Sequence, residues 1–175
     1  MNTESVATPA PAQKTPAFAK TDAEFCPRPI QLKHILVPID LSMKCLKALE
    51  YAASFASQYG AKITLLHLID PADIMGEAAP AFFREKDLPT AERELAQIRE
   101  RHIPSDIPTG IFVRHDAAAN GILIATDEFE PDLVIVATHG RTGLPRLFLG
   151  STAEKVIRSA SCPVLVVREG ERDFA

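Results

Sequence analysis

A glycine-bearing stretch from Thr138 to Thr152 carries the clearest chemistry in the sequence. It joins an apolar run to a segment with the pattern of a helix, and free backbone N–H groups at the start of a helix favour negative charge. The N–H groups of Gly150, Ser151 and Thr152 would therefore suit an oxyanion or a phosphate chain. Glycine at 140 and 150 would allow a positive φ, or a close approach of the backbone to a phosphate oxygen.

An acidic side chain, Asp40, follows the apolar run 34–39. Ligands of open α/β sheets bind outside the carboxyl ends of the strands, so Asp40 and the donors after residue 138 are expected to meet there. Each feature also has a purely structural interpretation. Ser151 to Glu154 form a capping box, and Asp40 or Ser42 could simply begin the first helix.

Several other chemistries lack the residues they need. The sequence holds neither G-x-x-x-x-G-K-[ST] nor G-x-S-x-G, and no G-x-G-x-x-G follows the first strand. The five histidines form no i, i+4 pair, so no metal cluster is indicated. The three cysteines, Cys26, Cys45 and Cys162, form no C-x-x-C pair, which fits a reducing compartment.

The elements that must position these residues alternate between strands and helices. Nearly continuous apolar runs predict strands, and three- and four-residue apolar spacing predicts helices. Strands are expected at 34–40, 63–69, 111–114, 133–137 and 164–167, and helices at 42–59, 90–102, 118–129 and 151–161. This alternation predicts an α/β fold, an open doubly wound five-stranded parallel sheet with helices on both faces. The polar, proline-punctuated stretch 71–89 is predicted to be a long excursion.

Composition limits the class of protein. The chain has 175 residues, of which 46% are hydrophobic and 24% charged, as expected for a soluble globular protein. A net charge of −4 argues against binding to nucleic acid or to an anionic membrane. Because residues 1–33 contain no secretory apolar run, and no stretch is long enough to span a membrane, we expect a cytoplasmic protein. Residues 1–33 are predicted to be a disordered tail rich in Ala, Pro and Thr, residues 34–169 the folded domain, and residues 170–175 a short C-terminal end.

From about residue 33 to residue 168 the sequence resembles the universal stress protein family. The nucleotide-binding members carry G-x2-G-x9-G-[ST]; Gly140, Gly150 and Ser151 match its later positions, and Ala137 replaces its first glycine. The resemblance implies an adenine nucleotide α-hydrolase-like fold. The other matching segments are Ile35–Ser42, Leu65–Asp70 and Cys162–Val167.

The resemblance also implies a ligand, ATP with Mg²⁺, held at the sheet edge. Asp40 would contact the adenosine side, and Leu68 would meet the adenine through its backbone. Asp116, where many relatives carry glycine, could accept from ribose hydroxyls or repel phosphate. The residues that bind the phosphates would be Gly140, Gly150, Ser151 and Thr152. The methyl group of Ala137 would lie near the phosphate path. Arg141 and Arg146 would lie either beside the phosphates or merely in solvent.

A homodimer paired through the C-terminal strand, 164–167, is implied in the same way, the alternative being that the N-terminal tail or the excursion covers this apolar edge. The leading hypothesis is an ATP-binding stress-response or regulatory module. Its ATP hydrolysis would be slow at most, because the sequence offers no evident water-orienting base or lysine clamp. The alternatives are a nucleotide-free stress protein acting only through protein contacts, and an enzyme that forms an acyl-adenylate or transfers AMP.

Overall fold

The computed structural model describes residues 29–70, 81–138 and 149–168, with the side chains of 81–87 left aside. The predicted excursion therefore lies partly outside the described residues, and the predicted N-terminal tail almost entirely. The chain divides into two units, residues 1–30 and 31–175. Only Pro29 and Ile30 of the first unit are described, and Ile30 is exposed. All that follows concerns the second unit.

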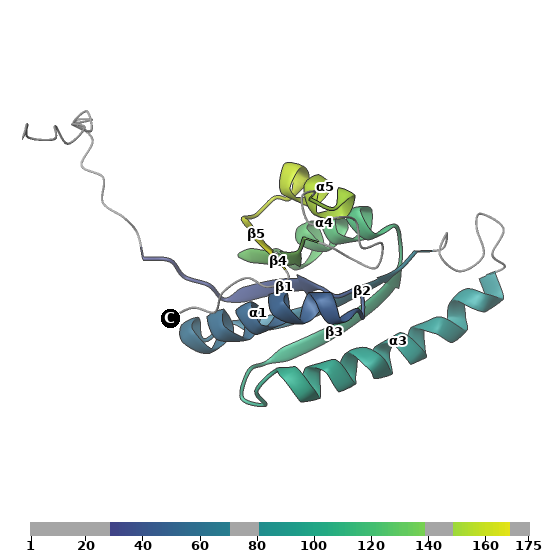
Figure 1. The fold of residues 1–175 in the computed structure, drawn as a ribbon, viewed down its shortest axis with the longest axis horizontal. Coiled ribbons are helices and arrows are strands. Elements are labelled where there is room, and N and C mark those ends of the chain that lie inside the picture. Colours follow the sequence, from purple (N-terminus) through teal and green to yellow (C-terminus); the bar gives the residue numbers. More distant parts are fainter. Residues whose placement is uncertain (1–28, 71–80, 139–148, 169–175) are drawn as a thin grey trace, which may run out of the picture. The chain divides into compact units, whose positions relative to one another are not determined.

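Five parallel strands form one sheet in the order β3-β2-β1-β4-β5 (Figure 1). From β1 the chain passes outward to β2 and β3, and then returns to place β4 on the other side of β1. This reversal between β1 and β4 is the point at which open α/β sheets bind ligands. The predicted fold is confirmed. The strands are β1 (His34–Pro38), β2 (Lys62–Ile69), β3 (Thr109–His115), β4 (Leu133–Ala137) and β5 (Val164–Val167).

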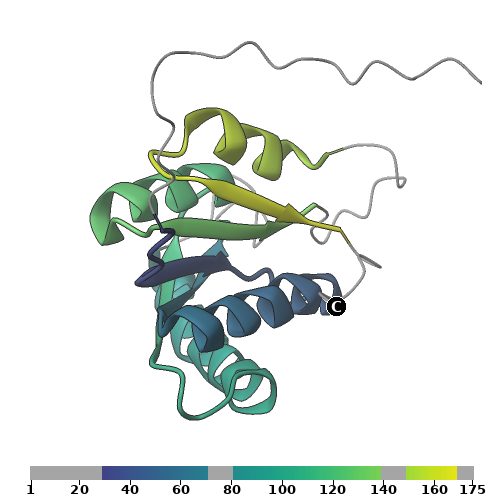
Figure 2. The same cartoon turned by 90° about the vertical axis from the view of Figure 1, so that its left-hand side faces the viewer.

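Helices cover both faces of the sheet (Figures 1 and 2). Alternate side chains of β1 point to opposite faces, so that Ile35 and Val37 pack in one core cluster and Leu36 in another. The first cluster lies under α1 and α3, and the second under α4 and α5. The helices are η1 (Met43–Cys45), α1 (Leu46–Tyr59), α3 (Ala81–His102), α4 (Ala118–Phe129) and α5 (Ser151–Ser159).

Several predicted boundaries are wrong. The strand expected at 34–40 ends at Pro38, and the strand expected at 111–114 extends from Thr109 to His115. The helix expected at 90–102 begins at Ala81, so that residues 81–89 of the predicted excursion are helical. Pro89 suggested a break, since proline lacks the N–H that closes a helical hydrogen bond. The helix nevertheless continues through it, and Arg93 Nε donates to the Pro89 carbonyl at 3.2 Å. Leu95, fully buried against the sheet, holds α3 in place, and burial of such a side chain contributes about 1.5–3 kcal/mol.

Other helix ends follow the sequence pattern closely. Gly60 ends α1 in the left-handed conformation, with φ of 69°, which glycine adopts without the steric cost that a side chain would bring. Helix α4 has the predicted bounds, whereas α5 ends two residues early, at Ser159. In the part of the chain that the structure describes, no helix is both long enough and apolar enough to cross a bilayer.

Candidate functional site

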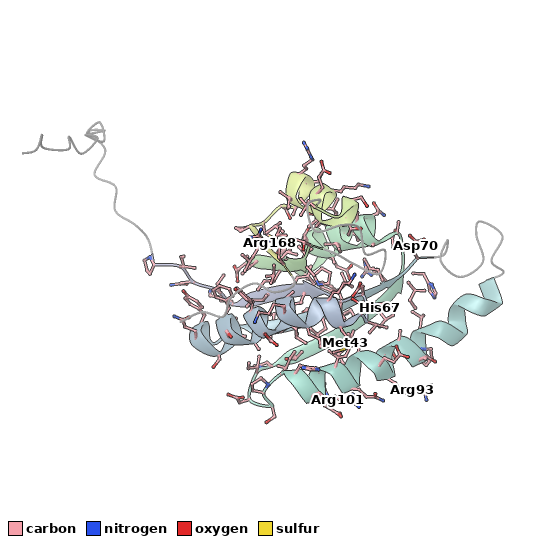
Figure 3. All side chains as sticks on the ribbon, in the orientation of Figure 1. Met43, His67, Asp70, Arg93, Arg101 and Arg168 are labelled. Carbon is pink, nitrogen blue, oxygen red and sulfur yellow. The ribbon has the colours of Figure 1, made fainter. Side chains whose placement is uncertain are left out.

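A cavity of about 310 Å³ opens at the carboxyl ends of β1, β2 and β4, beside the first turns of α4 and α5. This volume lies at the lower end of the range for small-molecule sites, roughly 300–1,000 Å³. Figure 3 shows His67 and Asp70, two of its wall residues, at the end of β2. Gly140, Arg141 and Arg146 lie outside the described residues. Six predicted site residues come together in the wall: Asp40, Leu68, Ala137, Gly150, Ser151 and Thr152.

A larger hollow of about 820 Å³ runs along residues 99–109, between the end of α3 and the start of β3. It lies at the amino end of the sheet, whereas ligands of open α/β sheets bind at the carboxyl end. It contains none of the predicted site residues. The smaller cavity at the β1–β4 reversal is therefore the better candidate.

Asp40 stands at the end of β1 with its two carboxylate oxygens in different roles. Its Oδ1 accepts hydrogen bonds from the backbone N–H of Ser42 at 3.0 Å and from the Ser42 hydroxyl at 2.7 Å. These bonds stabilise a turn in which Leu41 has a positive φ of 62°. Asp40 Oδ2 is buried and has no hydrogen-bond partner among the described residues. A buried acceptor left in this way costs about 1–3 kcal/mol, and a ligand that donates to it would remove the cost.

The same contacts bear on the alternative that Asp40 or Ser42 simply begins the first helix. Ser42 precedes η1 but makes no side-chain cap, because its hydroxyl donates to Asp40 instead. Asp40 thus supports the turn with Oδ1, whereas its Oδ2 is buried and accepts no hydrogen bond of ordinary geometry from the described residues, although Asp40 as a residue belongs to the cavity wall. The structural and the ligand-binding interpretations are compatible in a single side chain.

Cys45 lies beside this carboxylate in the cavity wall. Its thiol donates to the Ser42 carbonyl, with 2.8 Å between Sγ and O. Burial, followed by the negative charge of Asp40, raises the pKa of the Cys45 thiol to about 12. The thiol is therefore protonated near neutral pH, and it is neither a nucleophile nor a second negative charge beside Asp40.

His67 links the ends of β1 and β2. Its Nδ1 lies 2.6 Å from the carbonyl oxygen of Ile39, and because a carbonyl can only accept, Nδ1 carries the hydrogen. In the neutral ring, Nε2 is then the acceptor. A backbone bond from Ile39 N–H to the Leu66 carbonyl, at 2.8 Å, reinforces the same junction. His67 holds the chain that carries Asp40 against β2.

The end of β4 is joined to the start of α5 through Gly150. Its N–H donates to the Thr138 carbonyl at 3.0 Å, and a Cβ added at Gly150 would lie 2.8 Å from that oxygen. Gly150 has an ordinary φ of −60°. The expectation of a positive φ is wrong, and the close approach that requires glycine is to the protein's own backbone.

The capping box expected at Ser151 to Glu154 does not form. Gly150 occupies the N-cap position, Ser151 is already the first helical residue, and neither residue caps the helix with its side chain. The Glu154 carboxylate pairs instead with Arg158, at 2.9 Å from Nη2. No described side chain caps the first turn, and Ser151 and Thr152 of that turn line the cavity. The positive end of the α5 dipole is therefore directed to the cavity.

The structure also places two other residues considered for the site. Ala137 lines the cavity and packs against the core cluster under α1, and its effect on the phosphate path stays a prediction. Asp116 is not among the wall residues. Both of its carboxylate oxygens accept from Asn120 Nδ2, at 3.0 and 3.2 Å. The two roles considered for Asp116 stay predictions.

The sequence pattern missed the wall residues that α4 provides, Ala118 and Ile122. They follow β3 closely, and the rule that ligands bind at the carboxyl ends of strands is the one signal that could have indicated them. Cys45 was also missed as a wall residue. Among the described residues, no group of three or more His, Cys, Asp or Glu could hold a metal ion by itself.

Comparison with known proteins identifies the family. The model described as "Universal stress protein family" matches residues 31–168. A universal stress protein of Thermus aquaticus is 33% identical over 143 residues, covering 78% of this chain and 98% of its own. Another, of Methanocaldococcus jannaschii, is 28% identical over 144 residues, covering 81% and 85%.

Solved structures share the fold. One, described as a hypothetical protein used to assign biochemical function from structure, has a TM-score of 0.72 and 25% identity, covering 82% of this chain and all of its own. A universal stress protein solved in complex with cAMP has a TM-score of 0.56 and 22% identity, covering 79% and 98%. One from Archaeoglobus fulgidus in complex with dAMP has 0.52 and 20%, covering 78% and 98%.

Proposed function

We propose that this chain, which belongs to the universal stress protein family, binds an adenine nucleotide in the cavity at the carboxyl edge of its sheet. The ligand we favour is ATP with Mg²⁺. The proposed role is that of a nucleotide-dependent regulatory module in a stress response. The observation that carries the proposal is the first turn of α5, which no described side chain caps and which lines a cavity whose wall also includes Asp40.

The phosphate end of the ligand would lie against α5. The N–H groups of Ser151 and Thr152, with their hydroxyl groups, are donors that suit phosphate oxygens, and the helix dipole adds to the attraction. Gly150 brings the β4 backbone close to this turn. These donors are built into the fold, so binding would not have to organise them first.

The base and sugar would lie toward α4 and β2. Leu68, Ala118 and Ile122 give this end of the wall an apolar surface suited to a flat heteroaromatic ring. Asp40 Oδ2 would accept a hydrogen bond from a hydroxyl or amino group of the adenosine. The relatives solved with cAMP and with dAMP support an adenine nucleotide as the class of ligand.

The residues present are compatible with Mg²⁺ carried by the ligand. Mg²⁺ prefers oxygen ligands and usually binds through substrate phosphates with one or two carboxylates. The hydroxyl groups of Ser151 and Thr152 are the oxygen ligands that the phosphate end of the wall offers. Bound Mg²⁺ would neutralise phosphate charge near the carboxylates of Asp40 and Asp70.

We propose binding with at most slow hydrolysis. Among the described wall residues there is no lysine or arginine, the groups that clamp a transferring phosphoryl group in fast phosphoryl transfer. Cys45 is protonated and does not supply a nucleophile. A role in which nucleotide occupancy is read by another protein fits these residues better than rapid turnover does.

We further propose that two copies pair through β5. This strand is at one edge of the sheet, and three of its four residues are only partly buried, although all are Val or Leu. An apolar sheet edge of this kind tends to be covered. We place the protein in the cytoplasm, because a reducing compartment suits the free thiols of Cys45 and Cys162.

Calorimetric titration tests the nucleotide site. We expect saturable binding of ATP with MgCl₂. Substitution Ser151→Asp places a carboxylate at the first helical position, where it favours the helix but repels phosphate. It should weaken ATP binding by about tenfold or more, the effect of roughly 1.4 kcal/mol, and leave adenosine binding nearly unchanged.

The matched control is Ser151→Asn, because asparagine has nearly the same shape as aspartate and carries no charge. It should bind ATP within about threefold of the unmodified protein, since its amide still donates a hydrogen bond. The proposal fails if the unmodified protein binds no adenine nucleotide. It also fails if Ser151→Asp binds ATP as well as Ser151→Asn does.

A further inference from the structure

Gly121 occupies an unusual place for glycine. It lies in the first turns of α4, it is buried, and its N–H donates to the Ala117 carbonyl at 2.9 Å. Among the described glycines, Gly60 has a positive φ and Gly121 does not. The backbone conformation of Gly121 is therefore one that any residue can adopt. Glycine within a helix destabilises it relative to alanine. A requirement for space would explain its presence.

The space above Gly121 is filled by Leu68. A Cβ added at Gly121 would lie 2.5 Å from Leu68 Cδ2, 2.9 Å from Leu68 Cδ1 and 3.0 Å from the Asp116 Cβ. Cβ atoms essentially never lie closer than 3.0 Å to such neighbours. The isobutyl group of Leu68 therefore sits in a notch that exists only because residue 121 has no side chain.

Of these neighbours, Leu68 is the one free to move. The N–H of Asp116 donates to the Ile69 carbonyl at 3.2 Å, and its carboxylate is held by Asn120. The methyl groups of Leu68 end a flexible side chain. On one side they pack against the core cluster that contains Ile122, and on the other lies the cavity. A side chain at residue 121 would push Leu68 toward the cavity, where there is unfilled volume.

We infer that Gly121 determines the depth of the base end of the cavity, by giving Leu68 a notch outside the volume that the ligand needs. The inference rests on the proposed function, because it concerns the same cavity. It assigns to Gly121 a positioning role, although Gly121 is not itself in the cavity wall. Phosphate recognition at α5 is a separate matter, since Ser151 and Thr152 lie on another element.

Substitution Gly121→Ala tests this role. In the ligand-free protein, the ¹³C-methyl signals of Leu68 should shift, and a structure should show both Cδ atoms displaced into the cavity. Affinities for adenosine and for ATP with Mg²⁺ should fall by the same factor, at least about tenfold, which is the lower end for one methylene group in an apolar pocket. Equal factors are expected because the change acts on the base end alone.

A double variant distinguishes this positioning role from general destabilisation of the fold. Substitution Leu68→Ala removes the side chain that the new methyl group would displace. When Gly121→Ala is added to Leu68→Ala, the affinity should therefore fall by less than about threefold relative to Leu68→Ala alone, because the two substitutions act through the same contact. The control is Gly110→Ala, because a Cβ there would meet nothing closer than Phe112 Cε2, at 3.7 Å. It should leave ligand affinity unchanged.

The outcomes distinguish the two proposals. If the unmodified protein binds neither adenosine nor ATP, the proposed function fails and this inference fails with it. If the unmodified protein binds but Gly121→Ala binds equally well, or weakens ATP without weakening adenosine, the inference alone fails. Leu68 methyl signals that do not move in Gly121→Ala also overturn it, whatever the affinities.

Discussion

The backbone N–H of Gly150 donates to the carbonyl oxygen of Thr138 at 3.0 Å, and this bond joins the end of β4 to the start of α5. A Cβ at residue 150 would lie 2.8 Å from the same oxygen. Substitution Gly150→Ala should therefore lower the free energy of unfolding by about 1–3 kcal/mol, the usual cost of overpacking. Urea denaturation measures this. A loss no larger than that of Gly110→Ala, where a Cβ meets only ordinary contacts, would contradict the prediction.

Asp40→Asn tests the buried oxygen that lacks a donor. An asparagine oxygen can replace Oδ1 in accepting from Ser42, but its NH₂ group would replace Oδ2, the acceptor that we propose for the ligand. We expect adenosine and ATP affinities to fall by about 1.5–3 kcal/mol, the range for a hydrogen bond to a charged group. Calorimetry measures the loss. Unchanged affinity for adenosine would show that Asp40 Oδ2 faces no ligand donor.

Stability should depend on pH through His34. Burial, followed by the charge of Lys62, lowers the pKa of His34 below its ordinary value of 6.5, despite the opposing effects of the Phe129 carbonyl and Asp132. Between these two pKa values the unfolded chain binds a proton that the folded chain does not. The free energy of unfolding should therefore fall as the pH drops from 6.5 to the folded pKa, and the loss should stop growing below it.

The variant His34→Gln isolates this contribution, since glutamine does not titrate. Urea denaturation of both proteins across the same pH range should show a smaller decline in the variant. Equal slopes would mean that His34, which bonds Thr64 Oγ1 at 2.8 Å and the Phe129 carbonyl at 3.1 Å, does not control this part of the pH dependence.

Val166→Pro tests pairing through β5. The carbonyl groups of Pro163 and Val167 accept hydrogen bonds from the chain of β4 and the residue that follows it. Because successive residues of a strand direct their backbone groups to opposite sides, the N–H and carbonyl groups of Val166 point to the outer edge of the sheet. Proline at 166 would remove an outward N–H and leave the bonds to β4 intact. We expect it to convert a dimer into a monomer in light scattering after size exclusion, whereas Val166→Thr, which keeps the N–H, should remain dimeric. A dimer that persists in Val166→Pro would place the contact elsewhere.

Long, uniform patterns made the fold predictable from sequence. The buried runs 133–137 and 164–167 became β4 and β5 with the expected bounds, because a strand covered on both faces needs apolar side chains at every position. Helix α3 was harder, since Pro89 signals a break that the continuing helix does not obey. Its start at Ala81 depends on the wider structure, and local propensity does not determine it.

Part of the residue set of the candidate cavity was predictable from the sequence, whereas the contacts that shape the cavity were not. Asp40, Leu68 and the residues after 149 were indicated by strand ends and by family motifs, and the structure brings them into one cavity wall. The positive φ considered for Gly150 was wrong, and its contact with Thr138 was missed because a contact with a residue twelve positions earlier leaves no local trace in the sequence. The notch at Gly121 was missed for the same reason: Gly121 lies in α4, and its neighbour Leu68 lies in β2, far away in the sequence.

The β1–β4 reversal has a consequence for biosynthesis. Asp40 leaves the ribosome early and Ser151 late, yet both stand in the wall of one cavity. If the proposed function holds, a nascent chain could not bind nucleotide tightly until α5 has emerged and docked, so binding would stabilise only chains that extend through α5. A chain cut short before α5 would gain none of this stabilisation.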